Sequence, residues 1–400
     1  MNYLDVVFVF FLDLKMKTSY KFGRKRIALA GKFRFFGLIL PVLLFLFIYS
    51  CSNNDDPLPL TNFGISKRLI IDNFEGEEFA VVANGTYSMM QAYSTSATDG
   101  THLDFQLVAD KFPVIMKDQE NNEWNVFGIA VSGPRLGEQL KVMNSMIGFW
   151  FSFSAMFPRV TIYGEGNQTR FFSSSGSNDW LIDPNQVYTG AAKEGIPALT
   201  FPDFDLFSGN GASFVADNEL VLTYFDGEIV RVYPHKIMDH HEIVNEQSKL
   251  GSAVVSYCPL TGTGSIWLSK VNNQILKFGV SGLLYNSNLI LYDRETDSNW
   301  SQMRQQSVSG EFISTIPVII PYVEMTWAGA KKLASTVKIL SDNNSRGRDY
   351  NKYPYGDYRT NNERINYPLD FKDDRLPAKE RVLAIIINNK AKAYRFEHFN

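Results

Sequence analysis

Apolar residues along the chain occur mostly in short runs separated by glycine, asparagine and aspartate. Short apolar runs bounded by turn-forming residues are typical of β-strands. The strands predicted in this way lie at 69–71, 126–131, 160–163, 221–225, 253–257, 289–292 and 382–387. Helical patterns are few and lie at 234–245 and at 325–335, where Thr326 is the expected cap. The pattern therefore predicts a β-rich α+β fold.

Two long stretches of the chain repeat the same residues in the same order. Residues 75–165 and 250–342 share six anchors, among them a Trp that follows a Val-Ser-Gly triplet at the same spacing. We interpret them as two copies of one strand-rich repeat unit. A shorter match joins residues 221–233 to 382–394, where apolar residues surround an Asp-Gly or an Asn-Asn turn. These matching hairpins are predicted to flank the C-terminal domain.

The N-terminal region has the features of an export signal. Residues 15–34 are rich in Lys and Arg, residues 35–49 carry no charge, and Ser50 and Cys51 follow. This order is typical of a secretory signal, and the apolar run is short for a membrane-spanning helix. Residues 48–51 (IYSC) resemble the lipobox of bacterial lipoproteins, in which the cysteine is acylated and becomes the mature N-terminus. We expect Cys51 to be lipidated and anchored in the lipid bilayer; the alternative is a signal anchor that is never cleaved.

These features divide the chain into five predicted parts. They are a signal peptide with lipobox (1–50), a polar tether (51–68), a first, degenerate repeat unit (69–165), a linker (166–195) and a main domain (196–400). The tether is too hydrophilic to pack. Its acidic residues resemble those of exported lipoproteins, which indicates a location in the cell envelope, on the outer membrane, facing the periplasm or the surface.

Composition excludes one class of partner and limits the redox chemistry. The chain of 400 residues has a formal net charge of −3, so it offers no basic field that could hold nucleic acid. It contains two cysteines, Cys51 and Cys258. Lipidation of the first leaves Cys258 without an intramolecular disulfide partner.

The second repeat unit contains polar clusters that the first unit lacks. Residues 257–260 (YCPL) and 279–288 (GVSGLLYNSN) have no like residues in the first copy, although the framework residues recur. Because packing residues should recur in both copies, the added residues indicate a site. A Cys258 thiolate beside His241 suits a nucleophile activated by imidazole, or a copper or zinc site with His235 as a further ligand. The alternatives are a core histidine and a buried cysteine.

Two familiar catalytic motifs are excluded by single residues. The His241-Glu242-x-x-Asn245 run lacks the second His of zinc proteases, and Leu283 replaces the last Gly of a serine-hydrolase elbow around Ser281. The candidate catalytic residues are Cys258, His241, Glu242 and Asn245. The candidate ligand-binding residues are Ser281, Tyr285, Asn286, Asn288 and Arg294.

Several of these stretches together resemble one known family. Residues 241–245 (HEIVN), 257–260 (YCPL), 279–288 and 373–383 (DDRLPAKERVL) are similar to the signatures of a bacterial and archaeal envelope family catalogued as domain-of-unknown-function family 3179. The resemblance covers about residues 190–396 and implies no established activity. Members of the family often carry a second cysteine where this chain has Thr261, so a dithiol redox pair is not expected here.

Two functions from different classes follow. The first is an envelope lipoprotein with a Cys258–His241 centre that acts as a thiol-dependent enzyme or binds copper or zinc. The second is a non-catalytic envelope module that binds glycan, another envelope polymer or a small polar ligand.

Overall fold

The computed structural model describes residues 67–399 apart from 158, 166–175, 177–178 and 210–212. All described residues belong to one compact unit that comprises residues 53–400. The predicted signal peptide, Cys51 and most of the predicted tether lie outside the described residues, as does part of the predicted linker.

Most described strands lie in six sheets of three to five strands, which we number as blades 1 to 6. Blade 1 contains β1 (Lys67–Phe74), β2 (Glu77–Asn84) and β3 (Met89–Ser94), and blade 2 contains β4 (Gln106–Leu107), β5 (Val114–Lys117), β6 (Glu123–Asn125) and β7 (Ala130–Ser132). Blade 3 has the order β12 (Phe204–Phe207), β25 (Val337–Leu340), β14 (Val230–Pro234), β13 (Leu220–Phe225) and β24 (Val323–Thr326).

The other three blades complete the set. Blade 4 has the order β11 (Leu199–Thr200), β15 (Ile243–Ser248), β16 (Gly251–Cys258) and β17 (Thr263–Leu268). Blade 5 has the order β10 (Val187–Thr189), β20 (Phe278–Tyr285), β21 (Asn288–Asp293), β22 (Asn299–Ser301) and β23 (Gln306–Ser309). Blade 6 has the order β8 (Ser145–Phe149), β26 (Arg381–Ile387), β27 (Lys390–Arg395) and β9 (Thr161–Ile162). A short sheet of β18 (Lys270–Val271) and β19 (Gln274–Ile275) lies between β17 and β20 in sequence. The helices α1 (Trp150–Met156), α2 (His235–His241) and α3 (Trp327–Ala330) follow β8, β14 and β24, respectively.

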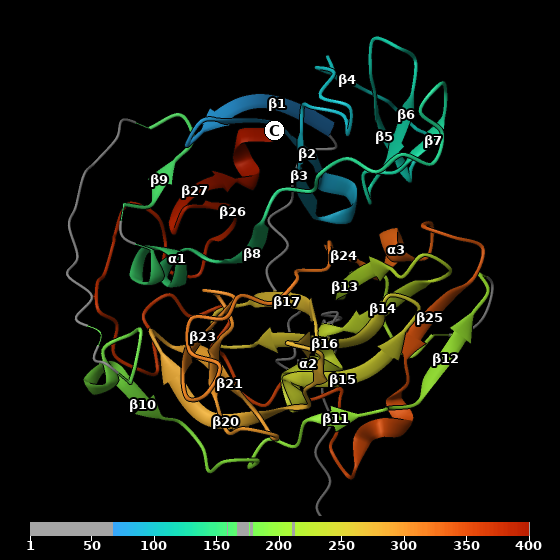
Figure 1. Ribbon diagram of the computed structural model, residues 1–400. Helices are drawn as coiled ribbons and strands as arrows, with labels where there is room; N and C mark the ends of the chain where they lie inside the picture. The colour runs from blue at the N-terminus through green and yellow to red at the C-terminus, as the bar shows by residue number, and fades with distance from the viewer. Residues whose placement is uncertain (1–66, 158, 166–175, 177–178, 210–212, 400) are drawn as a thin grey trace, which may run out of the picture. The chain divides into compact units, whose positions relative to one another are not determined.

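Buried apolar clusters join each blade to the next. Blades 1, 2 and 3 share one cluster, and further clusters join blade 3 to 4, 4 to 5, 5 to 6 and 6 to 1. This succession closes a ring, as in a six-bladed β-propeller (Figure 1). The prediction of a β-rich fold is confirmed. The architecture is six blades of one propeller, however, and not two repeat units with flanking hairpins. The predicted hairpins, β13–β14 and β26–β27, are central pairs of blades 3 and 6.

Some residues nevertheless occupy like positions in opposite blades. In blades 2 and 5, Asp118 and Asp293 each accept a 2.9 Å hydrogen bond from the indole N–H of Trp124 and Trp300, respectively. In blades 3 and 6, a parallel pair (β14 with β25, β27 with β9) lies next to the central hairpin. A Trp begins the helix that follows β8 in blade 6 and the helix that follows β24 in blade 3.

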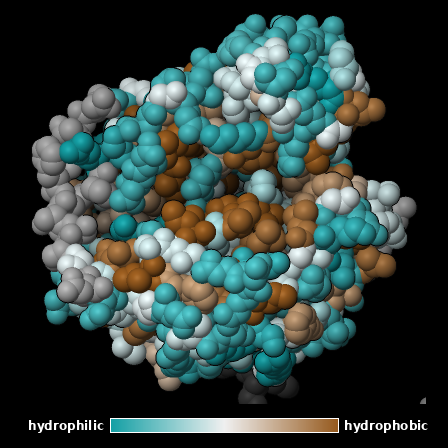
Figure 2. Space-filling view, in the orientation of Figure 1, coloured by the Kyte–Doolittle hydropathy of each residue, from teal (hydrophilic) through white to brown (hydrophobic). Residues whose placement is uncertain are grey.

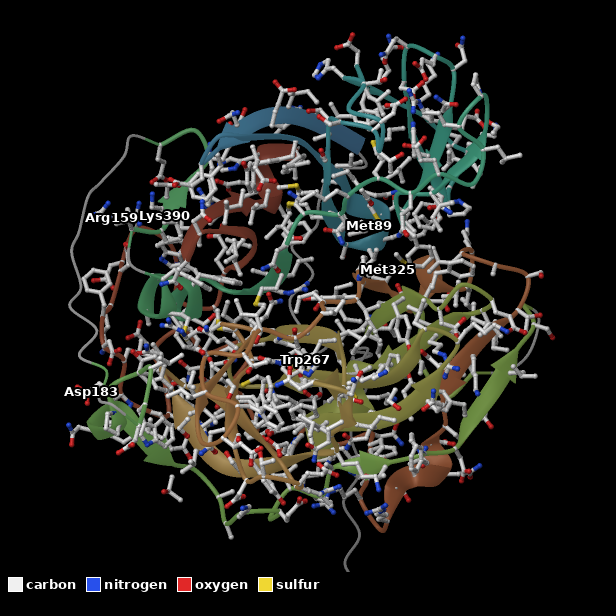
Figure 3. The ribbon with its side chains drawn as sticks, in the orientation of Figure 1. Met89, Arg159, Asp183, Trp267, Met325 and Lys390 are labelled. Carbon is white, nitrogen blue, oxygen red and sulfur yellow. The ribbon has the colours of Figure 1, made fainter. Side chains whose placement is uncertain are left out.

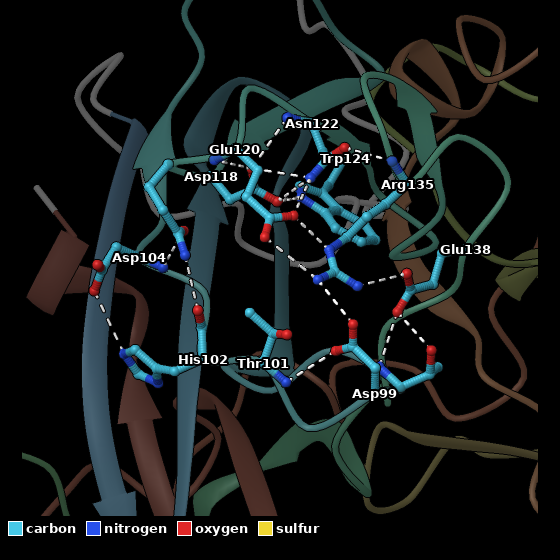
Figure 4. Close-up of polar contacts among 12 residues, drawn as sticks. Asp99, Thr101, His102, Asp104, Asp118, Glu120, Asn122, Trp124, Arg135 and Glu138 are labelled. Atoms are coloured by element: carbon cyan, nitrogen blue, oxygen red, sulfur yellow. Dashed lines mark hydrogen bonds and ion pairs between the residues drawn. The ribbon is translucent and has the colours of Figure 1, made fainter.

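A polar network fixes the turn between β5 and β6 (Figure 4). Besides the indole of Trp124, the carboxylate of Asp118 accepts the backbone N–H of Asn122 at 3.0 Å. The guanidinium of Arg135 pairs with three carboxylates, those of Asp99, Glu120 and Glu138. Because these charged groups satisfy one another, the network is best explained as a support for blade 2.

Apolar side chains gather toward the middle of the face in Figure 2, where the surface is hollowed, and hydrophilic side chains make up most of its margin. Met89 of β3 and Met325 of β24 lie close together near the middle of the same view and belong to one buried cluster (Figure 3).

Two predicted helices are shorter than expected. The helix predicted at 234–245 ends at His241, because Glu242 adopts a positive φ of 57° and the β-branched Ile243 and Val244 join β15. The helix predicted at 325–335 is reduced to α3, and the side chain of Thr326 makes no capping hydrogen bond.

Candidate functional site

A pocket of about 210 Å³ lies where α2 meets the Tyr-rich segment 350–359. Helix α2 begins directly after β14, with Pro234 in an extended conformation at its N-cap position. The pocket is lined by residues from both elements, among them His235, Lys236, Asp239, Tyr353 and Arg359. A pocket that combines aromatic and titratable side chains in this way is the usual place for a ligand.

His235 is an exception to the rule that buried polar groups find partners. Its side chain is only 4% exposed, and neither ring nitrogen has a hydrogen-bond partner among the described residues. The ring lies 4.2 Å from the ring of Tyr257, and Nε2 is 3.4 Å from Glu324 Oε2. Burial, together with the charges of Arg381 and Arg359, holds the pKa of His235 well below 6.5, so the imidazole is neutral at pH 7.

Asp239 lies one turn further along α2 and is also buried. Burial raises the pKa of its carboxyl to about 7, although the nearby charge of Arg359 opposes this rise. Asp239 therefore exchanges a proton near neutral pH and is able to donate a hydrogen bond when protonated.

The cations that line the pocket differ in their pairing. Lys236 pairs with Glu219 at 3.0 Å. Arg359 is half-buried with its guanidinium carbon 3.6 Å from the centroid of the Tyr353 ring, and within the described part of the chain it has neither an ion pair nor a hydrogen bond. Its planar fork of donors is therefore available to an anion, which guanidinium groups bind in a bidentate manner.

Cys258 and His241, the predicted centre, each contact other groups of the protein. Cys258 is 1% exposed, its Sγ contacts the carbonyl oxygen of Ser287 at 3.8 Å, and burial raises the pKa of its thiol to about 11. Both ring nitrogens of His241 are used, Nδ1 by the Pro197 carbonyl at 2.8 Å and Nε2 by the Tyr350 hydroxyl at 2.7 Å. No group of three or more metal-ligating side chains occurs among the described residues, so the predicted set of Cys258, His241 and His235 is not formed as a copper or zinc site.

The two remaining candidate catalytic residues hold neighbouring segments together. The amide of Asn245 donates to the carbonyl of Phe278 at 2.8 Å and accepts its N–H at 2.6 Å, which links blade 4 to blade 5. Glu242 accepts a hydrogen bond from the Tyr355 hydroxyl at 3.1 Å, and burial raises the pKa of its carboxyl to about 7.

The five candidate ligand-binding residues have partners within the protein. Ser281 donates to the Ile290 carbonyl, Tyr285 to Asp370, Asn286 to the Ala155 carbonyl, Asn288 to Thr261 and Gln302, and Arg294 to Glu194. These hydrogen bonds lie within blade 5 or connect it to neighbouring segments, and none of the five residues lines the pocket at α2.

Sequence reasoning missed the residues that make the pocket distinctive. Asp239 and Arg359 lay outside every motif, although the sequence predicted that the Tyr-rich stretch 350–358, together with the loop 279–288, binds glycan or another envelope polymer. The buried Lys379 was missed as well; its Nζ lies 3.2 Å from the Tyr358 ring centroid, and burial lowers its pKa to about 7. The available signal was the density of Tyr at 350–359, which is unusual for a solvated loop.

Within the described residues, none of the helices has the length and apolar character needed to span a membrane. Residues 193–400 match the model of a family described as Protein of unknown function (DUF3179). No curated protein and no solved structure matches the chain significantly.

Proposed function

The chain belongs to the family described as Protein of unknown function (DUF3179), whose membership brings no activity with it, so we propose a function from the pocket at α2. We propose that the protein binds a small polar ligand with an anionic group, and that Arg359 holds this group. The observation that carries the proposal is the presence, in one pocket, of an unpaired guanidinium and a buried, unpartnered imidazole.

The chemistry of the lining selects the ligand class. A pocket of about 210 Å³ is small for a ligand site, which favours a sugar acid or a short carboxylate over a polymer. Arg359 would pair with a carboxylate or phosphate, and protonated Asp239 would donate to a second oxygen. Neutral His235 would donate from one ring nitrogen and accept at the other, which removes the cost of leaving it unpaired.

We treat residues 75–165 and 250–342 as two copies of one unit, which the equivalent positions of Asp118 and Asp293 support. The shorter match aligns residues 221–233 with 382–394. Two residues beyond each end of this match, His235 corresponds to Phe396. A residue needed only for packing would be apolar in both halves, so the imidazole is explained by binding.

Replacing Arg359 with Gln is expected to weaken the binding of succinate, glucuronate or phosphate about tenfold, because one charge-assisted bidentate contact is lost. Isothermal titration calorimetry measures the dissociation constants. Arg68→Gln, at an exposed position on β1, is the matched control and should bind like the wild type. Equal affinities for all three proteins, or equal affinity for neutral glucose, would show that Arg359 does not hold an anion.

The same titrations carry a second readout. The pKa of Asp239 is about 7, so the carboxyl is neutral below that pH and adds a negative charge beside the bound anion above it. Affinity should therefore fall about tenfold as pH rises from 6 to 8, and Asp239→Asn should remove most of this dependence.

We further propose that the protein is an envelope lipoprotein anchored in the bilayer through Cys51. The order of basic residues, apolar run and lipobox-like IYSC supports this. Cells grown with radiolabelled palmitate should yield labelled wild-type protein and labelled Cys258→Ala protein, whereas Cys51→Ser protein should carry no label. Label that persists in the Cys51→Ser protein would rule the anchor out.

A further inference from the structure

A second groove, outside the pocket at α2, lies beside blades 1 and 2 and has a volume of about 550 Å³. Its lining includes Asn84, Tyr87, Phe112 and Lys332, and also the carboxylate of Asp110. The rings of Tyr87 and Phe112 are 4.5 Å apart, and Lys332 Nζ lies 5.5 Å from the centroid of Tyr87. Asn84 is 2% exposed, and its Oδ1 has no hydrogen-bond partner among the described residues.

The groove has a counterpart beside blades 4 and 5. Lys332 lies five residues after the Trp that begins α3, and Ala155 lies five residues after the Trp that begins α1. Phe112 lies six residues before Asp118, and Tyr285 lies eight residues before Asp293. Each of these aspartates accepts a hydrogen bond from an indole in its blade, so Phe112 and Tyr285 occupy similar places in blades 2 and 5.

The counterpart is covered by a segment of the chain itself, residues 367–370 (YPLD). Asp370 accepts hydrogen bonds from the Tyr285 hydroxyl at 2.5 Å and from Asn286 Nδ2 at 3.1 Å. Its backbone N–H donates to Asn286 Oδ1 at 2.7 Å, and the same Asn286 amide donates to the Ala155 carbonyl at 3.1 Å. A carboxylate and a backbone N–H of the bound segment are thus both recognised.

The groove beside blades 1 and 2 offers the same two kinds of contact from different residues. In the counterpart, Tyr285 and Asn286 hold a carboxylate; the corresponding residues of the groove are Phe112 and Pro113, which cannot do so through their side chains. The groove instead has Lys332 at the position of Ala155, and this lysine supplies a cation. The unpartnered Asn84 Oδ1 is an acceptor for a backbone N–H. Tyr87 and Phe112 provide an aromatic wall for an apolar side chain.

We propose that this groove binds a short segment of a partner polypeptide that carries an acidic residue, with the carboxylate paired to Lys332 and a backbone N–H donated to Asn84. The aromatic pair packs against the apolar residues of the segment. The groove shares no lining residue with the anion pocket, and neither Arg359 nor Asp239 lines it.

Fluorescence anisotropy with fluorescein-labelled YPLD tests this inference, with YPLN as the neutral match. YPLD should bind the full-length protein, and Lys332→Gln should weaken its binding about fivefold while leaving that of YPLN unchanged. Lys331→Gln is the matched control, because that neighbour pairs with Asp217 and does not line the groove. Arg359→Gln should leave YPLD binding unchanged, which separates this inference from the proposed function.

Three results would overturn the inference. They are the absence of YPLD binding, an equal loss in the Lys331→Gln protein, and an equal effect of Lys332→Gln on both peptides.

Discussion

Glu324→Leu is expected to lower the free energy of unfolding by about 3–5 kcal/mol, the largest effect on stability that we expect from one substitution. Glu324 is 2% exposed on β24 of blade 3 and forms an ion pair with Arg381 on β26 of blade 6. Burial lowers the pKa of Arg381 only to about 10, so the guanidinium remains charged at neutral pH. Removal of the carboxylate would leave a buried cation without its counter-charge.

Denaturant unfolding followed by circular dichroism measures this effect. The double variant Glu324→Leu/Arg381→Met is the informative control, because apolar residues of similar size often replace a buried ion pair at little cost. It should recover most of the lost stability. If the double variant is as unstable as Glu324→Leu, the loss comes from packing and not from the uncompensated charge.

Cys258 is expected to react with a thiol reagent at least a thousandfold more slowly in the folded protein than in the unfolded protein. With a pKa of about 11, about one thousandth of the thiol is ionised at pH 8, and the side chain is also shielded from solvent. The assay uses the Cys51→Ser protein, in which Cys258 is the sole cysteine, with and without denaturant.

This experiment decides between the two functions that the sequence left open. Slow reaction in the folded protein supports the binding function, since a nucleophilic cysteine must be accessible as a thiolate. Rapid reaction in the folded protein would contradict the burial of Cys258 and restore thiol-dependent catalysis as the leading hypothesis.

The motifs recognised in the sequence mark a family, but the structure uses many of their polar residues for support. Asn245 was a candidate catalytic residue, but its side-chain amide forms hydrogen bonds with both the backbone carbonyl and the backbone N–H of Phe278. Asn288 was a candidate ligand-binding residue and bonds to Thr261 and Gln302. Polar residues that cluster in sequence do not reveal whether their hydrogen bonds go to a ligand or to the protein.

The sequence by itself determined the β-rich content, the positions of many strands and the family, because these depend on local patterns of apolar and turn residues. The chain twice places a Trp six or seven residues after an Asp, and these residues proved to be equivalent structural anchors, as Trp124 and Trp300 illustrate. Only the tertiary structure decided that there are six blades and that the pocket lies between α2 and segment 350–359. The physical reason is that burial and pairing depend on residues distant in sequence: His241 is satisfied by Tyr350, whereas no distant residue satisfies His235 within the described part of the chain.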